Sequence, residues 1–188
     1  MVKNEDTYQA DGSKEISLRL NHYDDIFSDF DIRPYSRRAL SSDFLDEIRR
    51  ASYDKYNDGI ELNLYVPETE RDAPKEEVIA DRLTTHFKKH FIILRKEKGK
   101  ILLLGWFMIC LGVASMILAT RIIYKDPTNN IGLSFLLAFL EPAAWFLLWE
   151  GMDQVIFTSK ELEPELSFYR KMANSHGRVR FNSSSLSS

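Results

Sequence analysis

Two long apolar stretches joined by one short loop constrain this chain more than any other feature. Residues 101–124 and 131–150 are each long enough to cross, as a helix, a hydrocarbon core about 30 Å thick. The loop between them, Tyr124–Asn130, is too short to carry the second helix far from the first. The pattern therefore predicts an antiparallel transmembrane hairpin, and the lipid bilayer is the first partner that we expect.

The charges that flank the hairpin predict its orientation. Residues 82–100, directly before the first span, carry seven basic residues and one acidic residue, whereas residues 1–81 carry 11 basic and 20 acidic residues. Basic flanks stay on the cytoplasmic side, so we expect a multi-pass protein of the inner (cytoplasmic) membrane with both termini in the cytoplasm. The polar first fifteen residues contain no apolar core of a signal peptide. Binding of nucleic acid by the basic block is an open alternative.

An acid beside a proline lies at the middle of the second span. Glu141 is about ten residues from Ile131, or about 15 Å along a helix, which is half the depth of the apolar layer. A carboxylate there costs about 2.5–3.5 kcal/mol on insertion scales, so it should face protein or water rather than lipid. Pro142 has no amide hydrogen and leaves the carbonyl of Ala138 without its helical partner.

Two interpretations of this acid stay open. If copies of the chain surround an axis, Glu141 repeats as a ring of carboxylates that favours cations, and Glu150 belongs to the cytoplasmic mouth. Trp145, one turn beyond Glu141, is then a candidate constriction. Alternatively, Glu141 is protonated and hydrogen-bonded across the hairpin, for example to Ser115. The first interpretation favours a homo-oligomer, since a lone hairpin offers few partners for an acid at bilayer depth.

Small residues recur along one side of the first span. Their spacing of three and four residues places them on one stripe of a helix, where another helix can approach closely. This predicted packing seam consists of Gly105, Gly112, Ser115 and Ala119.

The remaining residues predict a small α+β cytoplasmic domain over 14–98 in the order β-α-β-α, ending in a juxtamembrane helix. Alternating apolar residues indicate strands near 14–20 and 60–66, and helical spacing indicates helices near 43–55 and 74–98. Gly99 is expected to break or swivel the last helix before the membrane. Residues 151–181 are expected to form a C-terminal helix, interrupted near Pro164, and a short strand that adds a third member to the sheet, unless a neighbouring subunit supplies it. Residues 1–13 and 182–188 are expected to be disordered.

Three groups of residues in this domain are candidate ligand sites: a cluster of arginines, a cluster of aspartates and a pair of histidines. Arginine forks suit phosphate and carboxylate groups, so an anionic ligand is one interpretation of the basic cluster, and local ion pairs are the other. The aspartates between 24 and 31 lack the spacing of a calcium loop, and His86 and His90 lack a third metal ligand, so we predict no metal and no cofactor. The arginines of the cluster are Arg33, Arg37, Arg38, Arg49 and Arg50.

No pattern of an enzyme is visible. The chain contains no G-x-S-x-G elbow, no phosphate-cradling glycine loop, no Cys-x-x-Cys pair and no His-Glu-x-x-His helix. We therefore expect no enzymatic activity.

The motifs DFDIRPYSRRALSSDFLDEIRRA, before the hairpin, and EPAAWFLLWEGMD, in its second half, carry a resemblance. The chain resembles small, uncharacterised bacterial proteins with two transmembrane helices, and it is similar in architecture to membrane effectors of antiphage systems such as the Hailong type. That resemblance implies an oligomeric channel, a nucleotide or oligonucleotide signal and a partner enzyme encoded nearby. The pair Glu141-Pro142 also resembles the acid-proline pair of calcium uniporter pores, but there the pair begins the span, so no calcium selectivity is assigned.

Together these observations predict a homo-oligomeric inner-membrane ion channel or membrane-perturbing effector that its cytoplasmic domain gates. A membrane-anchored binding or scaffold protein without a pore is the alternative.

Overall fold

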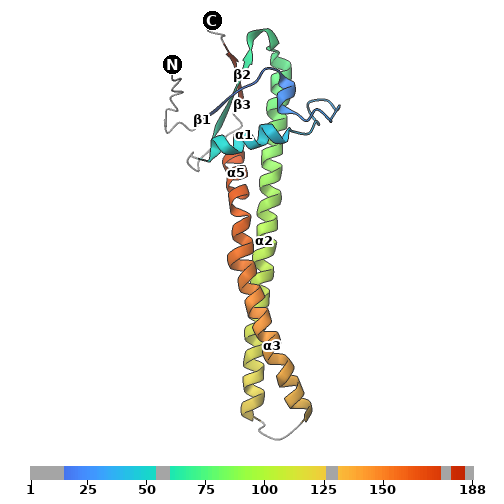
Figure 1. The fold of residues 1–188 in the computed structure, drawn as a ribbon, viewed down its shortest axis with the longest axis vertical. Helices are drawn as coiled ribbons and strands as arrows, with labels where there is room; N and C mark the ends of the chain where they lie inside the picture. Colours follow the sequence, from blue (N-terminus) through green and yellow to red (C-terminus); the bar gives the residue numbers. More distant parts are fainter. Residues whose placement is uncertain (1–14, 54–59, 126–130, 175–178, 185–188) are drawn as a thin grey trace, which may run out of the picture. The chain divides into compact units, whose positions relative to one another are not determined.

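The computed structural model describes residues 15–53, 60–125, 131–174 and 179–184 (Figure 1). The predicted disordered N-terminus, the expected turn at 57–59, the loop 126–130 and the last four residues of the tail lie outside these ranges. The chain divides into two compact units, residues 1–91 with 167–188, and residues 92–166. The chain is mostly helical, with one small sheet in the first unit and two long apolar helices.

The sheet of the first unit has three parallel strands in the order β1-β2-β3. They are β1 (Glu15–Arg19), β2 (Glu61–Pro67) and β3 (Val179–Ser184). The predicted third strand from the C-terminus is confirmed, and it continues through Ser184 rather than ending at Phe181. Residues 182–184, expected to belong to a disordered tail, are therefore part of the sheet.

Alternation of apolar and polar residues decides which face of the sheet is covered. Ile16 in β1 and Leu62 and Leu64 in β2 are almost wholly buried, and their polar neighbours along β1 are exposed. Each fully buried aliphatic side chain of this kind stabilises the fold by about 1.5–3 kcal/mol. The core is completed by helix α1 (Ser42–Ser52), which buries Phe44 and Ile48 on one side.

Helix α1 begins after Ser41, one residue before the predicted start near 43, and no side-chain hydrogen bond caps it. It ends at Ser52, three residues earlier than expected. Two short 3-10 helices, Tyr23–Ile26 and Glu68–Glu70, connect the strands to the helices.

A polar network ties the first of these turns to the start of helix α2. The Tyr23 hydroxyl donates to Glu76 at 2.7 Å and accepts a hydrogen bond from the Asp72 backbone amide at 2.9 Å. Arg71 donates to both oxygens of Glu76, at 2.5 and 3.0 Å. Burial opposes ionisation of Glu76, but the hydrogen bonds from Arg71 and Tyr23 outweigh it and hold the pKa of this carboxyl below its usual value.

Helix α2 runs without interruption from Ala73 to Lys125, over 53 residues. The expected break at Gly99 is wrong, because the residues on both sides continue the same helix. Nothing lies within 4 Å of the position that a Cβ atom on Gly99 would occupy. The apolar side of the N-terminal part of α2 buries Ile79, Leu83 and Phe87 in the first unit.

After the second apolar helix, α3 (Ile131–Asp153), the chain stays helical but changes its winding. A π-helical turn covers Gln154–Thr158, and the short helix α4 (Ser159–Glu161) leads into α5 (Glu163–Asn174). The predicted interruption is confirmed, but it lies at Leu162. Pro164 is instead the second residue of α5, where a missing amide hydrogen costs no helical bond.

We predict that Gly99→Ala raises the free energy of unfolding, because glycine inside an exposed helix costs about 0.5–1 kcal/mol relative to alanine. Gly105→Ala, the same change further along α2, should instead lower it, since the new Cβ would lie 2.9 Å from the Gly151 carbonyl oxygen. Thermal melting of the detergent-solubilised protein, followed by circular dichroism, measures both. A clear loss of stability in Gly99→Ala would contradict the uninterrupted helix.

The lowered pKa of Glu76 predicts a pH dependence of stability. A carboxyl whose pKa is lower in the folded chain stabilises it above the unfolded value of 4.5, and this stabilisation disappears as the pH falls through the folded value. The variant Glu76→Gln should lose stability at pH 7 and show a smaller decrease between pH 7 and pH 3. Melting temperatures measured across this range, with Glu77→Gln as the matched control, check the expectation.

Candidate functional site

Close contact between α2 and α3 forms the centre of the second unit. A Cβ atom on Gly105 would lie 2.7 Å from Val155 and 2.9 Å from the Gly151 carbonyl oxygen. A Cβ atom on Gly112 would lie 3.0 Å from the Ala144 carbonyl oxygen. The two helices therefore run in opposite directions where they pack together. Their backbones come into contact at the glycines, which have no side chains.

The predicted packing seam is largely the surface that makes this contact. Gly105, Gly112 and Ala119 are buried, at intervals of seven residues, and Ser115 is half-buried. The matching positions of α3, Ala144 and Gly151, are also buried and were not predicted. They could have been found from the same interval of seven residues, which keeps small residues on one side of a helix that winds around a neighbour.

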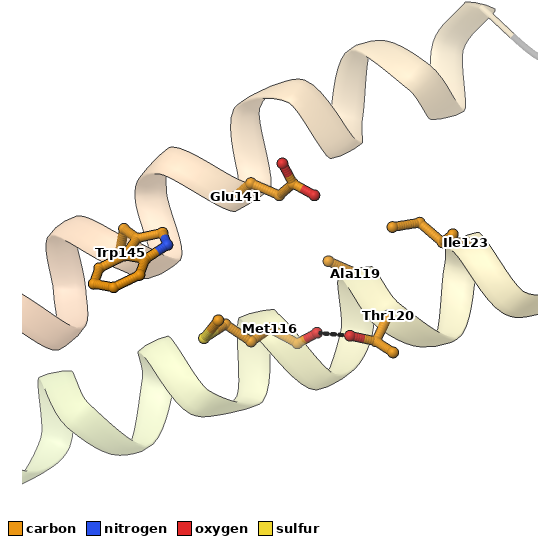
Figure 2. Close-up of a pocket in the computed structure, with 6 residues that line it drawn as sticks. All are labelled: Met116, Ala119, Thr120, Ile123, Glu141 and Trp145. Atoms are coloured by element: carbon orange, nitrogen blue, oxygen red, sulfur yellow. Dashed lines mark hydrogen bonds between the residues drawn. The ribbon is translucent and has the colours of Figure 1, made fainter.

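A cavity of about 310 Å³ opens between the helices beyond the glycine contacts (Figure 2). Helix α3 contributes an acid and an aromatic residue, and α2 contributes a stripe of residues at intervals of three and four. The lining residues are Met116, Ala119, Thr120, Ile123, Glu141 and Trp145. Of the α2 stripe only Ala119 was predicted, as part of the packing seam, because the other residues carry no unusual chemistry individually.

The Glu141 carboxylate points across this cavity toward Ala119 and Ile123 of α2 (Figure 2). Within the described part of the chain no hydrogen bond or ion pair joins it to another group, so the bond to Ser115, the example given for the second interpretation, is not formed. The one hydroxyl group among the lining residues, that of Thr120, donates to the Met116 carbonyl oxygen at 2.9 Å. Glu141 is exposed, and none of the described residues compensates its carboxylate.

The other predicted pore residues separate into two groups. Trp145 lines the same cavity one turn from Glu141, and 63% of the residue is exposed. Glu150 does not line it, and its carboxylate accepts a hydrogen bond from the Gln154 side chain at 3.2 Å. Pro142 lies inside α3 next to the acid without ending the helix.

The outer surface of both helices is apolar and uncovered. The most hydrophobic windows of the two helices are only 11% and 6% buried. The core helix of a soluble protein of this length would be mostly covered by its own chain, so these helices are compatible with membrane insertion. The largest exposed side chains include Leu103, Phe107, Phe135, Phe139, Phe146 and Trp149.

The predicted arginine cluster is distributed over local ion pairs. Arg33 pairs with Asp31 at 2.7 Å and Arg38 with Asp24 at 2.5 Å. Asp31 also accepts the Ala39 amide hydrogen, and its bonds to Arg33 and Ala39 hold its pKa well below the usual range. On α1, each arginine lies near an acid one turn earlier, Arg49 near Asp46 and Arg50 near Glu47. No such partner is described for Arg37. The second of the two interpretations, local pairing, thus fits four of the five arginines.

The histidine pair is packed rather than arranged as a metal site. The rings of His86 and His90 lie 4.2 Å apart, and His90 stacks on Tyr169 of α5 at 5.1 Å. Burial, followed by the positive charge of neighbouring groups, lowers the pKa of His86 to about 4, so the ring is neutral at pH 7. Among the described residues no group of three or more His, Cys, Asp or Glu could hold a metal ion.

We compared the chain with protein-family models, with curated proteins and with solved structures, and no match was found.

Proposed function

We propose that this chain is a homo-oligomeric inner-membrane protein that forms an ion channel or perturbs the membrane, and that its cytoplasmic unit controls it. In this proposal α2 and α3 form an antiparallel transmembrane hairpin. The basic residues between 82 and 100 keep both termini in the cytoplasm.

The observation that carries this proposal is the uncompensated carboxylate of Glu141. An ionisable group at bilayer depth faces protein or water, and it costs about 2.5–3.5 kcal/mol when it does neither. Two lining residues carry donors, Thr120 and Trp145, but among the described residues no hydrogen bond or ion pair reaches the Glu141 carboxylate. Neighbouring copies around an axis would place several such carboxylates, and the water they retain, along one path that attracts cations.

Control by the cytoplasmic unit is supported by the course of α2. The same uninterrupted helix packs Ile79, Leu83 and Phe87 into the core of the first unit and later carries Met116 and Ile123 of the cavity. A helix without a break transmits rotation better than a swivel would. The resemblance to antiphage effectors suggests a nucleotide or oligonucleotide as the signal, produced by an enzyme encoded nearby.

We predict that the purified protein in liposomes conducts cations and that Glu141→Gln reduces this flux by about tenfold, equivalent to roughly 1.4 kcal/mol in the energy of a cation at the ring. Glu141→Asp should retain most of the flux because it keeps the charge. Efflux of potassium from loaded vesicles of anionic and zwitterionic lipid provides the measurement.

The control variant for this experiment is Glu161→Gln, which removes a carboxylate from α4, outside the apolar window of α3. It should leave the flux unchanged. Vesicles that stay sealed with the unmodified protein would contradict the channel, and equal fluxes of Glu141→Gln and the unmodified protein would contradict the role of Glu141.

A membrane-anchored scaffold without a pore is the second candidate, and one observation favours it. The small residues Gly105 and Gly112 are already occupied by contacts with α3 of the same chain, so they leave no free seam for another copy. This candidate predicts that function survives replacement of both spans by an unrelated hairpin of equal length. We expect the replacement to abolish function, measured as growth arrest of a bacterial host that overproduces the chain.

A further inference from the structure

Among the described residues, no further strand pairs with either edge of the small sheet. β1 and β3 flank β2 in a sheet of three parallel strands. Among the described residues, no backbone hydrogen bond reaches 15–19 or 179–184 from outside the sheet. Purely parallel sheets are normally larger and well covered, so two open edges on so small a sheet are unusual.

At the β1 edge of the sheet, one acidic residue lacks the basic partner that its neighbour on β2 has. Glu15 and Glu61 are directly opposite in the register of β1 and β2, which is unfavourable for two carboxylates. Glu61 is compensated from the β3 side by Arg180 at 3.7 Å. Glu15 is exposed, and among the described residues its partner is the neutral Asn63 amide group, which donates to it at 3.0 Å. A second Arg180 beside β1 would give Glu15 the compensation that Glu61 already has.

The apolar residues on the covered face are also less buried at the two edges of the sheet than in its middle. One row across the sheet consists of Leu18, Leu64 and Phe181. Leu64 in the middle strand is wholly buried, whereas Leu18 and Phe181 at the two edges are only half-buried. An additional strand next to either edge would cover these side chains.

We propose that the β3 edge of one copy of this chain pairs, in parallel, with the β1 edge of a second copy and so continues the sheet between subunits. The added strand repeats the register of β2 and β3, with Arg180 of the second copy opposite Ser17 and close to Glu15. The two edges differ, so the contact is head-to-tail. Repeated around an axis, such a contact closes a ring, the symmetry that a central path through the membrane requires.

This inference rests on the proposed homo-oligomer, and a disulfide between copies tests it separately. In the proposed register Arg19 of one copy lies opposite Asn182 of the next. Within one chain these two residues flank Tyr65 in the same row, so their Cα atoms are two strand spacings apart, about 9.6 Å, which exceeds the reach of a disulfide of about 7 Å. A bond between cysteines at these positions therefore reports only on contact between copies.

The experiment uses the full chain with Cys110→Ser, and adds Arg19→Cys together with Asn182→Cys. Oxidation in the membrane should produce a ladder of covalent oligomers on a non-reducing gel. The control pair Glu15→Cys with Asn182→Cys is displaced by four residues, about 13 Å along the strand, and should stay monomeric. Adding Glu15→Lys to the first pair should reduce the yield several-fold, whereas Asp29→Lys, on an exposed loop, should not.

Two measurements on the same samples separate the possible results. If light scattering in detergent shows an oligomer but no ladder forms, the continued sheet is wrong and the membrane assembly stands. If the unmodified chain is a monomer at every concentration, the proposed oligomer fails as well. Cross-linking by Arg19→Cys alone indicates a symmetric β1–β1 contact and overturns the proposal.

Hydrogen–deuterium exchange on the unmodified chain provides a readout that does not depend on any variant. Amide groups of β1 and β3 should exchange more slowly in the oligomer than after dilution to monomer. Equal exchange in the two states would overturn the continued sheet.

Discussion

An ionisable group in the middle of a long apolar helix is the constraint on which the proposed function depends. Glu141 lies in the middle of α3, and its carboxylate faces a cavity lined also by Trp145, by aliphatic side chains and by a threonine that bonds its own helix. The alternative interpretations of this chain differ in what compensates the Glu141 carboxylate. Water and a cation, a neighbouring copy, or protonation can each compensate the acid, and only the first two give it a function beyond anchoring.

The cavity exists because the contacts between α2 and α3 are uneven along their length. Gly105 and Gly112 bring the two backbones into contact, as do Ala144 and Gly151 from the opposite side. Beyond Gly112 the lining includes larger side chains, Met116 and Ile123, and the space between the helices is no longer filled. The same small residues therefore stabilise the helix pair and determine where it opens.

Much of the local structure was predictable because it follows from periodicity. Alternating apolar residues predicted β1 and β2, and helical spacing predicted α1. The error at Gly99 has a physical reason. Glycine weakens a helix by about 1 kcal/mol, which neighbours with high helix propensity on both sides easily offset. The end of β3 was missed because Asn182 and Ser183 have low strand propensity, and pairing with β2 overrides it.

The amino-acid sequence by itself determined the two apolar segments, the position of Glu141 in the middle of the second and the small-residue seam, since each follows from composition and from spacing along one helix. Only the tertiary structure decided which residues face Glu141. It also decided that Glu150 accepts a hydrogen bond from Gln154 and does not line the cavity, and that four of the arginines pair with nearby acids. Contacts of this kind depend on the rotation of one helix against another and on the path of loops. Neither is encoded in a local pattern, because many distant residues fix them together.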